Sequence, residues 1–290
     1  ENDGGGLLVL KGLQNIHFIG IGGAGMSAIA HVLLKRGYQV SGSDLNAGHM
    51  GAKLAQEGAL VYMGHAECQV DDVDAVVISS AIHQNNPELM EAKKRNLPIL
   101  HRSDVLAEIL NHADGVAVAG AHGKTTTTSM LSQIFLAAKK DPTISVGGIL
   151  DAIGGNIRIG HSENFITEAC EYTNSFLKFH PTAGIILNVD ADHLDFFKDI
   201  DDIRHSFRKY AELIPENGVL VINKDIDKLN EITDGLKCKV ITFGLDDGAD
   251  YSASDISFDE KGHGCYTLIR NGQKTDMQIK LNVVGRHNIS

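Results

Sequence analysis

A glycine-rich segment near the middle of the chain has the residue types and spacing that suit the binding of a nucleotide triphosphate. A short apolar run leads into Gly120, Ala121, His122, Gly123, Lys124, Thr125 and Thr126. Backbone N–H groups of such a turn, and of the helix that begins there, point at phosphate oxygens. Lys124 adds a positive charge at the β and γ phosphates, and the Thr125 hydroxyl can ligate Mg²⁺. We therefore predict a phosphate loop here; a turn that merely caps a helix is the alternative.

Two polar residues follow later apolar runs in a way that suits a cation site beside this loop. Glu168 comes directly after one predicted strand, and His193 follows the next, with Asp190 and Asp192 close by in the sequence. Because the carboxyl ends of parallel strands meet at one edge of a sheet, we expect these groups to share a crevice with the phosphate loop. Glu168 and His193 are predicted as Mg²⁺ ligands, with Asp190 and Asp192 as secondary candidates. Without the loop, a surface carboxylate and a hydrogen-bonding histidine would be the simpler interpretation.

A second glycine turn lies near the start of the chain. A strand-like run at 16–19, the glycines Gly20, Gly22 and Gly25, a helical run at 26–36 and a second strand at 39–43 follow one another. The second strand ends at Asp44, as in a Rossmann-type unit. Taken alone, this pattern favours NAD. The same turn can cradle any diphosphate, and its glycines can also serve only the close packing of helix on strand.

The remaining pattern predicts two α/β domains joined by a polar linker at 111–115. In the first domain, strands are expected at 75–79 and 98–100, and helices at 87–95 and 103–110, with Ser103 as N-cap of the latter. In the second, helices are expected at 125–140 and 203–213, and strands at 116–119, 165–167, 183–188, 219–222 and 240–243. Residues 251–284 read as antiparallel hairpins at the sheet edge. We predict a Rossmann-like parallel-sheet domain at 1–112, then a P-loop ATPase-type α/β domain with an antiparallel edge at 113–290.

The composition narrows the classes of protein. The 290 residues suffice for two domains with ample cores. A formal net charge of −11 and the lack of a basic stripe argue against nucleic-acid binding. Four cysteines without CxxC spacing favour reduced thiols in a cytoplasmic protein. No apolar run reaches the roughly 18 residues that would predict membrane insertion.

Five segments together resemble the Mur ligase family, in the order in which that family carries them. They are HFIGIGGAGMS at 17–27, GAHGKTTT at 120–127, EACE at 168–171, NVDADHLD at 188–195 and GRHN at 285–288. Members of the family have a UDP-substrate domain, a central ATPase domain and a C-terminal amino-acid domain. The resemblance implies that this chain carries the first two domains and lacks the C-terminal one.

The resemblance is nearest to the branch that joins L-alanine to the carboxylate of UDP-N-acetylmuramate in peptidoglycan synthesis. It implies that ATP phosphorylates this carboxylate to an acyl phosphate, which the amine of L-alanine then attacks. Mg²⁺, Lys124 and the loop N–H groups would offset the repulsion between the carboxylate and the γ-phosphate. Since one domain is expected to be missing, we expect the fragment to bind its substrates and to turn over little. The alternatives are a murein-tripeptide-recycling member of the family, an NAD-binding Rossmann oxidoreductase, and a non-catalytic nucleotide sensor.

The match also implies roles for single residues. Lys124, Glu168 and His193 would be catalytic; Thr125, Glu168 and His193 would hold Mg²⁺; and Asn288 would contact the adenine side of ATP. The first glycine turn would hold the UDP diphosphate in place of NAD. The residues implied for the UDP substrate are Gly22, Gly23, Ala24, Gly25, Met26, Asp44, Ser79, Ser80, Asn156 and Arg158.

Besides the expected lack of the C-terminal domain, which is the largest departure, the sequence differs from many family members at two places. Cys170 stands between Ala169 and Glu171, where many members have an aspartate. Since Glu168 is retained, cation binding is expected to survive. Phe207 and Arg208 occupy the region in which several other branches carry a carbamylated lysine, as the alanine-adding branch would predict.

Overall fold

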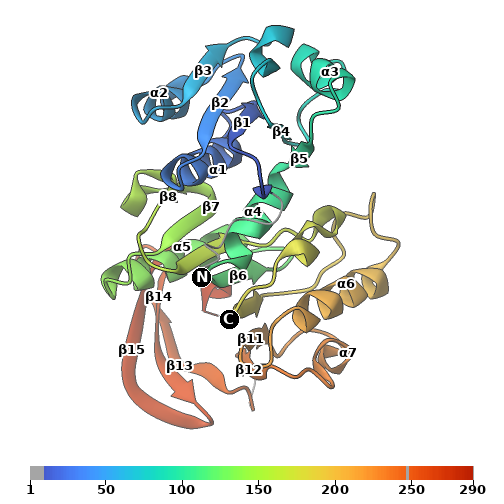
Figure 1. The fold of residues 1–290 in the computed structure, drawn as a ribbon. Helices are drawn as coiled ribbons and strands as arrows, with labels where there is room; N and C mark the ends of the chain where they lie inside the picture. Colours follow the sequence, from blue (N-terminus) through green and yellow to red (C-terminus); the bar gives the residue numbers. More distant parts are fainter. Residues whose placement is uncertain (1–9, 246–247, 290) are drawn as a thin grey trace, which may run out of the picture. The chain divides into compact units, whose positions relative to one another are not determined.

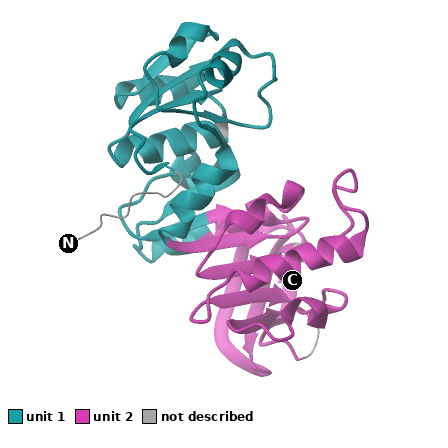
Figure 2. Cartoon of the chain, turned by 45° about the vertical axis from the view of Figure 1, so that its right-hand side comes forward, with its two compact units in different colours: residues 1–113, 132–166 teal, residues 114–131, 167–290 magenta. Residues whose placement is uncertain are grey.

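The computed structural model describes residues 10–245 and 248–289 of the chain (Figure 1). These residues form two compact units (Figure 2). The first contains the described residues up to Ala113 together with 132–166, and the second contains 114–131 with those from Thr167 onward. None of the described helices is both long enough and apolar enough to cross a membrane.

The first unit contains a five-stranded parallel sheet with the strand order β3-β2-β1-β4-β5. The strands are β1 (Asn15–Ile19), β2 (Gln39–Asp44), β3 (Leu60–Met63), β4 (Ala75–Ile78) and β5 (Ile99–His101). The helices that connect them are α1 (Ala24–Lys35), α2 (Gly48–Gln56), η2 (Glu67–Val70), α3 (Pro87–Lys94) and α4 (Arg102–Asn111). Every residue of β4 is buried, as expected for a central strand that helices cover on both faces. The predicted Rossmann-like parallel sheet is confirmed.

The second sheet has ten strands in the order β15-β14-β13-β12-β11-β10-β6-β9-β7-β8. They are β6 (Asp114–Ala119), β7 (Thr143–Leu150), β8 (Gly155–Arg158), β9 (Asn164–Glu168), β10 (Ala183–Ile186), β11 (Val219–Asn223), β12 (Lys239–Phe243), β13 (Tyr251–Phe258), β14 (His263–Arg270) and β15 (Gln273–Val284). The strands from β6 through β10 and β11 to β12 pair in parallel, whereas β13, β14 and β15 pair antiparallel. These last strands form the long curved ribbon in orange and red in Figure 1. The predicted antiparallel edge is confirmed.

Helices α5 (Lys124–Ala137) and α6 (Ile200–Glu212) lie close to the predicted helices at 125–140 and 203–213. The other helical elements are α7 (Leu229–Thr233) and the short 3₁₀ turns η3 (Asp151–Ile153), η4 (Tyr172–Lys178) and η5 (Arg286–Asn288). Helix α6 begins where the Asp199 carboxylate accepts a hydrogen bond from the Asp202 N–H.

Aromatic packing fixes α6 against the strand that leads to the phosphate loop. Tyr210 is fully buried and stacks on Phe176 at a ring-centroid distance of 4.9 Å, while Phe207 meets Phe176 edge-on at 5.3 Å. The Tyr210 hydroxyl donates to the carbonyl oxygen of Ala117 in β6, at 2.9 Å. Burial raises the pKa of Tyr210, so the phenol stays protonated and keeps this donor. Helix α6 therefore braces β6 from within the core.

Two local predictions were wrong, and several elements were missed. Ser103 is not an N-cap, because α4 begins at Arg102 and the Asp104 carboxylate accepts from the His101 N–H at 3.1 Å. The segment 111–115 is not a polar linker, since α4 runs to Asn111 and β6 begins at Asp114. Helix α2, strand β3 and the β7–β8 hairpin were not predicted; the hairpin contains four glycines, which made it read as a loop. The domain division at residue 112 stays a prediction.

Candidate functional site

The phosphate loop lies between the end of β6 and the start of α5. Gly120 and Gly123 have φ angles of +146° and +84°, which residues with a side chain rarely adopt. A Cβ at Gly120 would also lie 3.0 Å from the Cβ of Leu187, so a side chain there would crowd that residue. Helix α5 begins at Lys124, so its N-terminal N–H groups face the loop. The strand, glycine turn and helix that the sequence predicted are present.

Asn188 holds this loop from the neighbouring strand. Its side-chain oxygen accepts from the His122 N–H at 2.8 Å, and its side-chain nitrogen donates to the His122 carbonyl oxygen at 3.0 Å. Asn188 follows β10, which pairs with β6. In the sequence, Asn188 belongs to the NVDADHLD segment, for which no loop contact was predicted. An amide placed just past the strand next to a glycine loop was the available signal.

Lys124 forms an ion pair that the sequence did not predict. Its Nζ lies 2.9 and 3.2 Å from the two carboxylate oxygens of Glu171. The same Nζ donates to the carbonyl oxygens of Gly120 at 2.5 Å and Ala121 at 3.4 Å. The Glu171 side chain is 3% exposed and that of Lys124 16%. The ammonium group is thus held inside the loop, among oxygen atoms.

Three side chains with metal-ligand chemistry converge next to this pair. Single ligand atoms of Glu171, Asp192 and His193 lie within 4.8 Å of one another. His193 Nε2 is 3.6 Å from a Glu171 oxygen and 3.9 Å from an Asp192 oxygen. Two carboxylates and one imidazole fit a divalent cation, since Mg²⁺ prefers oxygen ligands and accepts few protein donors. Glu168 ends β9, which neighbours β6, but it does not belong to this cluster; its ligand role stays a prediction, as does that of Thr125.

The backbone beside the cluster is strained. His193, Thr173 and Asn174 adopt left-handed conformations with φ of 53°, 55° and 56°. Such conformations are costly for residues other than glycine, above all for a β-branched threonine, and they concentrate at functional sites. The ring of Tyr172 lies 4.7 Å from that of His193. Hydrogen bonding to Asp195 raises the pKa of the Tyr172 hydroxyl.

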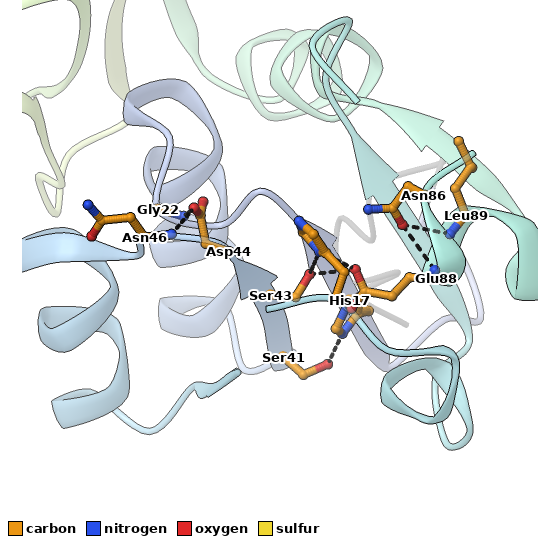
Figure 3. A network of polar contacts seen from close by, with 10 residues as sticks. His17, Gly22, Ser41, Ser43, Asp44, Asn46, Asn86, Glu88 and Leu89 are labelled. Carbon is orange, nitrogen blue, oxygen red and sulfur yellow. Dashed lines mark hydrogen bonds and ion pairs between the residues drawn. The ribbon is translucent and has the colours of Figure 1, made fainter. Parts of the chain in front are cut away.

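The first unit carries the second glycine turn at the carboxyl end of β1. The Asp44 carboxylate accepts from the Gly22 N–H at 2.9 Å and from the Asn46 N–H at 2.8 Å (Figure 3). A Cβ at Gly22 would lie 2.6 Å from the Cα of Ala47, so the turn is closed tightly. Asp44 therefore stabilises the backbone of the turn. The sequence predicted it only as a residue that contacts the UDP substrate.

A cation lies over this turn that the sequence analysis missed. A Cβ built on Gly25 would lie 2.7 Å from a guanidinium nitrogen of Arg102, so the arginine passes directly over the first turn of α1. Arg102 is exposed and comes from the start of α4. A helix N-terminus and a guanidinium both favour an anionic group.

The same edge of the sheet contains a buried polar network around Glu88 (Figure 3). One carboxylate oxygen is 3.2 Å from His17 Nε2; the other accepts from the Ser43 hydroxyl at 2.6 Å and from His65 Nδ1 at 2.7 Å. His17 also contacts the Ser41 hydroxyl through Nδ1 at 2.8 Å. Burial raises the pKa of Glu88, but the hydrogen bonds from His17, Ser43 and His65 outweigh it and hold that pKa below its usual value.

The other residues implied for the UDP substrate lie in several places. Ser79 and Ser80 follow β4 at the carboxyl edge of the first sheet. Met26 is buried, so only its backbone can face a ligand, and the side chain of Ala24 lies outside what the structure describes. Gly23 precedes α1 as its N-cap.

Asn156 and Arg158 lie in β8, in the hairpin that the sequence did not predict. Arg158 donates to the Pro142 carbonyl oxygen at 2.7 Å and pairs with Asp141, whose pKa it lowers, with His161, to about 2. Its guanidinium is thus already engaged. Asn288 lies in η5 and donates to the Val284 carbonyl oxygen at 2.8 Å.

Comparison with known proteins agrees with this architecture. The family description "Mur ligase family, catalytic domain" matches residues 15–114, and "Mur ligase middle domain" matches residues 118–290. A UDP-N-acetylmuramate–L-alanine ligase of Lachnospira eligens is 52% identical over 278 residues, which are 95% of this chain and 60% of that protein. The chain therefore spans about three fifths of the length of this curated relative.

Solved structures give the same result. The UDP-N-acetylmuramate-alanine ligase MurC of Thermotoga maritima has a TM-score of 0.78 and 29% identity, with 95% of this chain and 62% of that chain covered. The UDP-N-acetylmuramate:L-alanyl-gamma-D-glutamyl-meso-diaminopimelate ligase of Neisseria meningitides has a TM-score of 0.82 and 28% identity, with 95% and 90% covered. With the middle-domain match extending over more than half of its length, this chain belongs to the Mur ligase family.

Proposed function

We propose that this chain supplies the UDP-substrate and ATP sites of a ligase that joins L-alanine to the carboxylate of UDP-N-acetylmuramate. The observation that carries the proposal is the meeting of Lys124, the loop N–H groups and the Glu171–Asp192–His193 cluster at adjacent strand ends. The 52% identical relative of Lachnospira eligens is a UDP-N-acetylmuramate–L-alanine ligase, which supports the choice of substrates. Four free thiols suit the reducing cytoplasm, where we place the reaction.

The first chemical step brings two anions together. A carboxylate oxygen of the substrate attacks the γ-phosphorus of ATP, the bond from that phosphorus to the β–γ bridging oxygen breaks, and ADP leaves. Lys124 and the N–H groups at the start of α5 hold the phosphate oxygens and offset their repulsion of the incoming carboxylate. A divalent cation, which Glu171, Asp192 and His193 are placed to hold, supplies further charge neutralisation when bound. The alanine nitrogen then attacks the acyl carbon, and phosphate leaves.

The UDP half of the substrate fits the first unit. The diphosphate would lie against the N-terminus of α1 and the guanidinium of Arg102. An NAD-binding Rossmann site would use the acidic residue after the second strand for a ribose hydroxyl. Here both oxygens of Asp44 already accept backbone N–H groups of the turn. This favours a UDP ligand over NAD.

The test is amino-acid-dependent release of phosphate from ATP. The enzyme should be a protein with the length of the curated relatives that contains this chain, assayed with UDP-N-acetylmuramate and either L-alanine or the murein tripeptide. We expect release with L-alanine and its loss in Lys124→Met. Release with the tripeptide alone would identify a recycling ligase, which the similarity to the Neisseria structure makes the second candidate. Release with neither acceptor would refute the proposed function.

A further inference from the structure

The contacts of Lys124 leave its ammonium group no donor for a phosphate. A lysine has three N–H donors. Here they face the carbonyl oxygens of Gly120 and Ala121 and the two oxygens of Glu171, at 2.5 to 3.4 Å. The lysine that a phosphate loop uses for the β and γ phosphates is therefore fully engaged before any nucleotide arrives. Nucleotide binding must break some of these contacts.

Among the partners of Lys124, Glu171 is the one that an incoming phosphate is best suited to replace. Its contact with Lys124 joins two full charges, whereas the carbonyl contacts join a charge to a dipole. The side chains of the pair are 3% and 16% exposed, so water screens their attraction little. An incoming phosphate offers the same chemistry as the carboxylate, namely anionic oxygens for an ammonium donor. Exchange of one anion for the other is the direct route to a lysine–phosphate contact.

After release from Lys124, the Glu171 carboxylate would still have a partner nearby. Glu171 already lies 3.6 Å from His193 Nε2, and its oxygen belongs to the cluster that includes Asp192. A shift of the carboxylate away from Lys124 and toward His193 would leave it with a partner.

From this geometry we propose that Glu171 is a positioning residue. Without nucleotide it holds the ammonium group of Lys124, and when nucleotide binds it releases that group to the phosphates. The proposal rests on the proposed function and deepens it, since it names what the loop must give up to bind ATP. The proposal predicts the direction in which the nucleotide affinity changes when Glu171 is altered. Removing the charge of Glu171 frees Lys124 and should tighten nucleotide binding, whereas a carboxylate that supports the bound lysine would, when removed, weaken it.

The test measures affinity for a fluorescent N-methylanthraniloyl ATP in EDTA, so that no divalent cation takes part. The variants of the chain are Glu171→Gln, Glu171→Asp, Lys124→Met and the double variant Lys124→Met/Glu171→Gln, each checked for folding by circular dichroism. Asp195→Asn serves as the matched control. It removes one negative charge from the same region, but the Asp195 carboxylate accepts its hydrogen bond from the Tyr172 hydroxyl and not from Lys124.

We expect Glu171→Gln to lower the dissociation constant about fivefold to twentyfold, from the size of a charge-assisted hydrogen bond after partial screening. Glu171→Asp, which is shorter by one methylene, should give a smaller gain, and it keeps the test decisive if the glutamine variant fails to fold. Asp195→Asn should change the affinity by less than about twofold. In the Lys124→Met background, Glu171→Gln should bring no gain beyond that control.

Each opposing result has a separate meaning. Weaker or unchanged nucleotide binding in both Glu171 variants would overturn the proposed role of Glu171 while leaving the ATP site intact. An equal gain in Asp195→Asn, or a gain that persists without Lys124, would reduce the effect to general electrostatics and also overturn it. If the unaltered chain failed to bind the nucleotide and Lys124→Met behaved identically, the ATP site itself, and with it this inference, would be refuted.

Discussion

The buried carboxylate of Glu88 gives a demanding test of how the first unit is held together. We consider its replacement by alanine. In the native chain, the two oxygens of Glu88 take three contacts, from His17, Ser43 and His65. The side chains of Glu88 and His17 are fully buried, and that of His65 is 17% exposed. Glu88→Ala would therefore leave a buried imidazole and a buried hydroxyl without their acceptor.

The magnitude follows from these contacts. Loss of one member of a buried, hydrogen-bonded charge network costs about 3–5 kcal/mol, because the remaining polar groups stay desolvated. Glu88→Gln keeps the shape and one acceptor oxygen, so we expect a loss of about 1–2 kcal/mol. For a folded unit of this size, the alanine variant should lower the melting temperature by about 6–20 °C. Urea unfolding followed by circular dichroism measures both free energies.

The pH dependence of stability checks the direction of the Glu88 pKa shift independently. The pKa of Glu88 is lower in the folded chain than its ordinary value of 4.5. Its contribution to stability is therefore complete above about pH 4.5 and is lost as the pH falls through the folded-state pKa. The stability gap between the native chain and Glu88→Gln should shrink as the pH falls below about 4.5 and through the folded-state pKa of Glu88.

The control is the neighbouring acid on α3. The Glu91 side chain is 10% exposed, but its partners Arg95 and Lys94 are 37% and 76% exposed and can turn to water when the carboxylate is lost. Glu91→Gln should therefore shift the urea midpoint clearly less than Glu88→Ala does. The reasoning fails if Glu88→Ala costs less than about 1 kcal/mol, or if its cost does not exceed that of Glu91→Gln. A stability gap that grows as the pH falls would contradict the assigned direction of the pKa shift.

Three further predictions concern the two sites and the core. Arg102→Ala should weaken the binding of UDP, measured by isothermal titration calorimetry, about threefold to tenfold, because it removes the guanidinium over the glycine turn. Asn188→Ala should speed amide hydrogen exchange at His122 and weaken ATP binding, since the loop loses both contacts that fix it. Tyr210→Phe should destabilise the chain to urea by about 1–2 kcal/mol, because the Ala117 carbonyl oxygen loses its buried donor.

The sequence predicted well wherever a pattern acts locally. The phosphate loop was found because Gly120, Lys124 and Thr125 form a contiguous motif between a strand and a helix. The antiparallel edge was found because turns and alternation mark hairpins in the sequence itself. The rule for parallel sheets predicted that the strand ends bearing the loop, Glu168 and His193 would meet. The strand order β10-β6-β9 makes these strands neighbours, and the role of Glu168 stays a prediction.

What the sequence could not supply were contacts between distant side chains. Glu171 lies 47 positions from Lys124, and nothing in its neighbourhood marks it as the partner of that lysine. Arg102 lies over Gly25 because α4 contacts α1, although the two helices are far apart in the sequence. The N-cap of α4 was misplaced because Ser103 has the usual chemistry of a cap, whereas Asp104 satisfies the first N–H instead.

The central place of β6 has a thermodynamic consequence. If a nucleotide binds at the ends of β6, β9 and β10 as proposed, it binds only chains in which these three strands are already paired. Occupancy of the crevice and cohesion of the sheet are then one linked equilibrium. At a ligand concentration one hundred times its dissociation constant, such linkage adds about 2.7 kcal/mol to the free energy of unfolding. In a cell rich in nucleotide, the ligand would act as a structural member of the second unit.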